Sequence, residues 1–110
     1  MKRFCLALDL KNNPELIAEY ESHHRQVWPE VQKSILNAGI LHLSLYRVHD
    51  RLCMILETTD DFSFEEKAEA DAANPVVQEW ETLMWKYQRP MPWAKPGEKW
   101  QVMDKICDIS

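Results

Sequence analysis

The chain opens with an alternation of apolar and polar residues. Residues 3–10 carry an apolar side chain at every second position, which is the period of a strand with one buried face. Residues 40–48 and 51–57 are two further runs rich in β-forming residues, and the two residues between them suit a tight hairpin. The pattern therefore predicts three strands, the second and third of them paired antiparallel.

A helical pattern separates the first strand from the second. From Pro14 onward, apolar residues recur at steps of three and four, as they do on an amphipathic helix. Pro29 lacks an amide hydrogen and disfavours helical geometry at Trp28, so we expect the helix to break there. A second helix should then cover 29–37, and Gly39 should close it.

The second half of the chain predicts two helices, a loop and a strand. Residues 59–61 can cap a short helix over 63–72, and a longer helix is expected over 75–87. The stretch 89–97 holds three prolines and should form an extended loop. Residues 99–109 alternate as a last strand. The predicted order is strand, helix, strand, strand, helix, strand.

This order indicates one α+β domain over residues 1–110, a ferredoxin-like sandwich of the dimeric α/β-barrel type, with an antiparallel sheet and helices on one face. In the strand over 40–48, alternation places Leu41, Leu43 and Leu45 on one face. The opposite face mixes polar and apolar side chains, namely His42, Ser44, Tyr46 and Val48. Such a face needs a cover, so we expect a homodimer or a closed pocket there.

Composition and charge exclude several classes of partner. The net charge is −5, and no basic stripe is present for a nucleic-acid backbone. No apolar run approaches the length that spans a membrane or forms a signal peptide. The widely spaced Cys5, Cys53 and Cys107 form no metal-binding pattern with the histidines. We therefore expect a cytoplasmic protein with free thiols that binds neither nucleic acid, membrane nor metal.

One stripe of the first helix combines aromatic residues with a histidine. Each residue advances by about 100° around a helix, so Tyr20, His24 and Trp28 lie on one face with apolar neighbours. His23 lies to one side and has no aromatic partner on its row. A lone histidine on an apolar face is usually a core residue, but a tyrosine one turn away favours a pocket. Both interpretations of His24 stay open on this pattern alone.

The same stripe resembles the signature of a known family. Tyr20-x-x-x-His24-x-x-x-Trp28-Pro29-Glu30 is similar to the motif of the L-rhamnose mutarotases, small dimeric ferredoxin-like proteins that interconvert the α and β anomers of a 6-deoxy sugar. The predicted order of elements also follows the family over most of the chain.

The resemblance implies roles for two residues of the stripe. It makes His24 the proton donor and Tyr20 a contact to a deoxy sugar, with no cofactor or metal. Anomer exchange requires one proton delivered to the ring oxygen and another removed from the anomeric hydroxyl. A histidine, with a usual pKa of about 6.5, can give and take protons at neutral pH.

The chain departs from the family at a residue that concerns the sugar. Rhamnose-specific members carry a sugar-contacting tyrosine on the second strand, and Leu43 stands at that position here. The resemblance therefore implies a mutarotase for a related sugar, and L-rhamnose and L-fucose both remain candidates.

A second departure concerns the last helix. The Trp-Trp-Lys-Tyr run of rhamnose-specific members is divided here between Trp80 and the later Trp85 and Lys86. One register places Glu81 and Thr82 at the binding positions, and the other uses the later run. We expect Trp80 and Trp85 as pocket walls, because indoles pack well on the apolar face of a sugar, with Trp28 and Lys86 also among the binding residues.

Two other classes of function share this fold. A haem-binding protein or a cofactor-light monooxygenase could use a helix histidine as an iron ligand. A non-catalytic dimeric binding module could present the tryptophans to a partner. A haem ligand has no particular need for a tyrosine one turn before the histidine.

Overall fold

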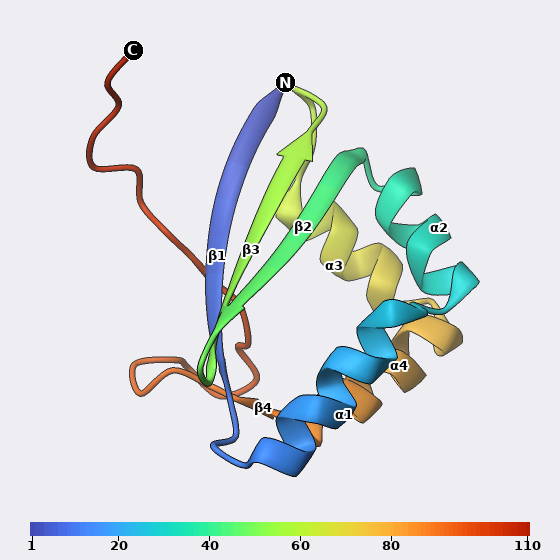
Figure 1. The fold of residues 1–110 in the computed structure, drawn as a ribbon. Helices are drawn as coiled ribbons and strands as arrows, with labels where there is room; N and C mark the ends of the chain where they lie inside the picture. The colour runs from blue at the N-terminus through green and yellow to red at the C-terminus, as the bar shows by residue number, and fades with distance from the viewer.

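The computed structural model describes all residues, 1–110, as one sheet with helices on one of its faces (Figure 1). The elements are β1 (Lys2–Leu10), α1 (Pro14–Arg25), α2 (Pro29–Asn37), β2 (Ile40–Val48), β3 (Arg51–Thr58), α3 (Phe64–Ala72), α4 (Pro75–Trp85), β4 (Gln88–Arg89) and β5 (Gln101–Val102). None of the helices combines the length and the apolar character that crossing a bilayer requires.

The sheet has the strand order of a ferredoxin-like fold, which confirms the predicted class. The order is β2-β3-β1-β4, every pair is antiparallel, and β5 also pairs with β1. The fourth position of the sheet is thus shared by two short pieces. β4 pairs with the end of β1 at Asp9 and Leu10, whereas β5 pairs with its middle at Leu6 and Ala7. The proline-rich segment 90–100 connects the two pieces.

The last predicted strand is wrong for most of its length. Only Gln101 and Val102 are in the sheet, and from Met103 onward the chain has no regular secondary structure. Ile106 and Ile109 are 95% and 89% exposed, so no surface of the chain lies beneath them. Alternation alone does not make a strand when neither a pairing edge nor an apolar face is available.

Side-chain caps and prolines set the helix boundaries largely as predicted. Asn13 caps α1, since its Oδ1 accepts hydrogen bonds from the next helical amides, and the break at Pro29 separates α1 from α2. The expected cap of α3 is wrong, because Ser63 Oγ accepts the bond from the Glu66 amide at 3.2 Å. α4 ends at Trp85, two residues earlier than predicted.

A β-bulge near the start of β2 changes the expected face of one leucine. The pairing with β3 shifts register between Ile40 and His42, so Leu41 turns outward and is 57% exposed. Ile40 is buried instead, whereas Leu43 and Leu45 keep the predicted helix-facing side. The extra residue of a bulge reverses the alternation of the residues before it.

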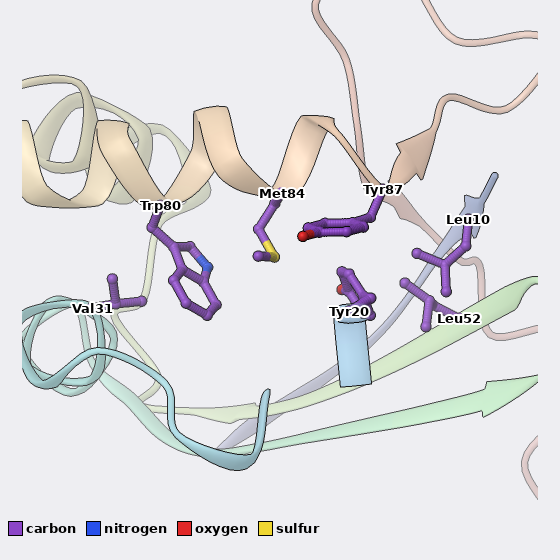
Figure 2. Close-up of a cluster of buried hydrophobic side chains, with 7 residues drawn as sticks. All are labelled: Leu10, Tyr20, Val31, Leu52, Trp80, Met84 and Tyr87. Carbon is purple, nitrogen blue, oxygen red and sulfur yellow. The ribbon is translucent and has the colours of Figure 1, made fainter. Parts of the chain in front are cut away.

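The core lies between the sheet and the helices in two clusters. The first joins β1, β3, α1, α2 and α4 through Leu10, Tyr20, Val31, Leu52, Trp80, Met84 and Tyr87. Figure 2 shows Trp80 and Met84 of α4, and Tyr87 two residues beyond its end, extending into this cluster. The second cluster, near the other end of the sheet, contains Leu6, Ile40, Leu56 and Phe62.

A buried carboxylate fixes the junction of β1, β3 and β4. Asp9 is buried, and its carboxylate accepts a hydrogen bond from Arg51 at 2.8 Å and pairs with Arg89 at 3.5 Å. The hydrogen bond from Arg51 and the two positive charges outweigh burial and lower the pKa of Asp9. The pairing holds the two-residue strand β4, and with it Gln88, against the end of β1.

We expect Gly39→Ala to destabilise the protein more than Gly97→Ala. Both glycines have positive φ, but a Cβ at Gly39 would lie 2.7 Å from Thr59 Oγ1, whereas a Cβ at Gly97 would meet nothing within 4 Å. Gly97→Ala should lower the free energy of unfolding by about 1 kcal/mol, the cost of the left-handed backbone. Gly39→Ala should lower it by about 1 to 3 kcal/mol more.

Urea unfolding of both variants measures this difference. Thr59→Ala, added to Gly39→Ala, should recover the additional loss and leave the backbone cost. Equal losses in the two single variants would contradict the proposed clash.

Candidate functional site

A cavity of about 610 Å³ lies between the sheet and the helices. Of its 24 lining residues, 17 are hydrophobic, so polar groups are few and each can orient a ligand. The other lining residues are His24, Ser34, Lys67, Asp71, Glu81, Gln88 and Glu98. The segment 90–100 contributes Trp100 as well as Glu98, so it forms part of the wall.

In neutral His24, Nε2 carries no hydrogen and can accept one. It lies in the last turn of α1, and its Nδ1 is 2.8 Å from the Tyr20 carbonyl oxygen. A carbonyl oxygen only accepts, so Nδ1 carries the hydrogen and the neutral ring keeps a lone pair on Nε2. Burial lowers the pKa of His24, the nearby His23 adds to this, and the bond to the carbonyl offsets part of it. The residue is therefore a neutral proton acceptor at pH 7.

Tyr20 places a hydroxyl donor beside the histidine. Its ring centroid is 4.3 Å from that of His24, because the two residues are one helical turn apart. Its hydroxyl accepts a hydrogen bond from Gln88 Nε2 at 3.4 Å. Burial raises the pKa of Tyr20 to about 12, so the phenol keeps its proton at neutral pH. That proton is free to be donated to a ligand.

Two of the predicted binding residues line the cavity next to this pair. Trp80 is buried, and its ring meets His24 edge-on with 5.5 Å between centroids. Leu43 lines the cavity from β2 and offers no hydrogen bond. The structure thus brings together Tyr20, His24, Leu43 and Trp80, which come from three elements.

Trp28 supports this group from outside the cavity. Its ring packs edge-on against Trp80 with 5.2 Å between centroids. It lines a neighbouring hollow of about 770 Å³, which shares the residues His24, Val27, Ile35, Ile40 and Leu43 with the cavity. His24 is therefore part of the wall between the two spaces.

Trp85 and Lys86 do not line the cavity, contrary to the prediction from the resemblance. Lys99 Nζ lies 4.6 Å above the Trp85 ring, and Lys86 pairs with Glu19 at 3.7 Å. Five and six residues after Trp80, they have rotated away from its face of the helix by about 140° and 120°.

One register places Glu81 and Thr82 at the binding positions, and only one of the two lines the cavity. Glu81 lines the cavity. Thr82 donates its hydroxyl hydrogen to the Gln78 carbonyl at 3.0 Å and does not line the cavity.

Gln88 and Trp100 are among the lining residues that the sequence did not predict. Gln88 belongs to the two-residue strand β4, and no periodicity marks so short an element. Trp100 falls in the strand predicted over 99–109, and the alternation there gives it no role at the site. Nowhere in the protein do three or more His, Cys, Asp or Glu side chains gather as metal ligands.

Comparisons with known proteins point to one family of enzymes. A family model described as L-rhamnose mutarotase matches residues 3–109. An L-fucose mutarotase of Xanthomonas campestris pv. campestris is 44% identical, and the alignment covers 100% of this chain and 90% of that protein. An L-rhamnose mutarotase of Phocaeicola vulgatus is 32% identical, with coverage of 87% and 85% respectively.

A solved structure supports the fold. The crystal structure of an L-rhamnose mutarotase from Formosa agariphila superposes with a TM-score of 0.72 at 17% identity, over 100% of both chains. At that identity the superposition supports the fold, and the family follows from the sequence matches. This chain belongs to the L-rhamnose mutarotase family.

Proposed function

We propose that the protein interconverts the α and β anomers of a 6-deoxy-L-hexose in the cavity between the sheet and the helices. The observation that carries the proposal is the pairing of His24 with Tyr20 at an apolar-walled cavity. Anomer exchange needs a proton removed from one oxygen on C1 and delivered to the other, which a neutral imidazole can do, and the Tyr20 hydroxyl keeps its hydrogen to hold the sugar by a hydrogen bond.

In the proposed reaction, His24 moves one proton between two oxygens. Nε2 takes the proton of the anomeric hydroxyl and delivers it to the ring oxygen as the bond between that oxygen and C1 breaks. Both oxygens are bonded to C1, so a single imidazole nitrogen can serve both. The Tyr20 hydroxyl donates a hydrogen bond to the sugar. Rotation of the open aldehyde and the reverse steps give the other anomer, with no net gain or loss of protons.

The apolar walls suit a sugar that lacks one hydroxyl. The indole of Trp80 can pack on the C–H face of the ring, and aliphatic side chains such as Leu43 can surround the methyl group at C6. Removal of water from the cavity also strengthens the hydrogen bonds made by His24 and Tyr20.

L-fucose is the first candidate substrate and L-rhamnose the second. The relative named for L-fucose is 44% identical, and the one named for L-rhamnose is 32% identical. Leu43 also stands at the position where, by the resemblance, rhamnose-specific members carry a tyrosine that contacts the sugar. The two sugars differ in configuration at C2 and C4, so a few side chains around the ring decide between them.

We also propose that two copies associate in the cytoplasm through the sheet face opposite the helices. On that face of β2, Tyr46 and Val48 are 59% and 73% exposed. Apolar side chains exposed together on one sheet face favour a cover, and a second copy supplies a matching surface through a two-fold axis.

The activity is tested by saturation transfer between the anomeric protons of L-fucose and of L-rhamnose, with and without protein. We expect faster exchange with one of these sugars, and a loss of about 10²- to 10⁴-fold in His24→Ala, the usual contribution of a general acid or base. His23→Ala is the matched control, because His23 contacts the Tyr87 hydroxyl at 3.1 Å and does not line the cavity. Full activity in His24→Ala would remove that residue from the mechanism.

The dependence of kcat/KM on pH should follow the fraction of His24 that is neutral. Burial lowers the pKa of His24 below its usual value of about 6.5, so the neutral form prevails from there upward. The rate constant kcat/KM should stay level above about pH 6.5 and fall by about tenfold per unit once the pH drops below the lowered pKa. A low buffer concentration limits exchange catalysed by the buffer. A rate that rises on acidification would contradict the proposed order of proton transfers.

The proposed dimer is tested by light scattering after size-exclusion chromatography. Tyr46→Glu should convert dimers to monomers, because an unpaired charge would be buried between the two sheets. Leu36→Glu is the control, since Leu36 is also exposed but lies on α2, away from that sheet face. A wild-type protein that is monomeric at micromolar concentration would contradict the proposal.

A further inference from the structure

The Gln88 side chain has a polar atom that the protein leaves without a partner. Gln88 is 4% exposed and lines the cavity. Its Nε2 donates to the Tyr20 hydroxyl at 3.4 Å, whereas its Oε1 is buried with no hydrogen bond. No other buried side-chain nitrogen or oxygen in the protein lacks a hydrogen-bond partner. A buried polar atom without a partner lowers the stability of the fold.

Packing alone does not explain a glutamine at this position. The buried neighbours Tyr20 and Leu10 belong to the apolar core, where a methionine would fill the same space without an unpaired oxygen. The Asp9 pairing also holds β4 through Arg89, so the sheet does not depend on the Gln88 carboxamide. The carboxamide oxygen is therefore best explained by a partner that is present only when a ligand is bound.

The Gln88 donor has a second consequence for Tyr20. Because Nε2 already donates to the phenol oxygen, the Tyr20 hydrogen is directed elsewhere, and Tyr20 and Gln88 both line the cavity in which a ligand would lie. Gln88 thus orients the Tyr20 donor while its own oxygen is free to accept. The two side chains together offer one donor and one acceptor to adjacent hydroxyls of a sugar.

We propose that Gln88 selects the substrate by accepting a hydrogen bond from one ring hydroxyl of the sugar through Oε1. This inference rests on the proposed function and deepens it. Leu43 and Trp80 form apolar walls, so a single buried acceptor has a large effect on which hydroxyl configuration fits. L-fucose and L-rhamnose differ in the orientation of two hydroxyls, and Gln88 Oε1 accepts a hydrogen bond from one of these two.

The test compares wild type with Gln88→Met on the sugar that the wild type uses and on its 2-deoxy, 3-deoxy and 4-deoxy analogues. Saturation-transfer NMR gives kcat/KM for each. We expect Gln88→Met to lower kcat/KM for the parent sugar by about 10- to 100-fold. For the analogue that lacks the hydroxyl bound by Gln88, the two proteins should agree within about twofold, because neither can make the bond.

Controls separate recognition from structure. Gln78→Met changes an exposed glutamine of α4 and should leave every rate unchanged. Gln88→Glu keeps an acceptor oxygen, and it should keep the preference among the four sugars even where its overall rate is lower. If thermal unfolding shows that Gln88→Met does not fold, the sugar preference of folded Gln88→Glu decides the matter.

Three outcomes would overturn the inference. Equal losses with all four sugars in Gln88→Met would assign Gln88 a structural role, and no loss with any sugar would assign it none. Loss of the preference in folded Gln88→Glu would also contradict acceptance through the oxygen. A wild type that accelerates no exchange for either candidate sugar would instead refute the proposed function, which is a separate result.

Discussion

The contacts of the Tyr20 ring join the parts of this protein on which the site depends. The ring is buried, lies 4.3 Å from His24 on its own helix, and lies 6.1 Å from Tyr87 at the end of α4. Its hydroxyl bonds to Gln88 on β4, and its backbone carbonyl fixes the His24 ring. The packing of α1 and the hydroxyl donor at the site therefore depend on the same side chain, and a substitution at Tyr20 would alter both, whereas the backbone carbonyl that holds His24 would remain.

The cavity exists because the helices do not cover the sheet evenly. Leu43, Leu45 and Met54 face the helices, yet they are only partly buried and line the cavity. Unfilled space beside apolar side chains lowers stability, since contacts are lost and apolar surface stays open. The two clusters at either end of the sheet offset this cost and keep the cavity between them open for a ligand.

The sequence predicted the features that depend on local periodicity and on proline. The first strand, the hairpin and the break at Pro29 follow from patterns within a few residues, and so does the common face of Tyr20 and His24. The short strands β4 and β5 depend on which edge of β1 is free, which no local pattern encodes. Gln88 could not be assigned to the site for the same reason, because the partners that surround it are distant in the sequence.

Because the fourth strand is divided into β4 and β5, the pairing of the sheet and the wall of the cavity depend on different residues. The segment 90–100 between them lines the cavity through Trp100 and is tied to α4 by the pairing of Lys99 with Glu81 at 2.6 Å. The hydrogen bonds of β4 and β5 with β1 do not involve that segment. A change in the length or sequence of this segment would therefore reshape one wall of the cavity and leave the strand pairings and the helix that carries His24 in place.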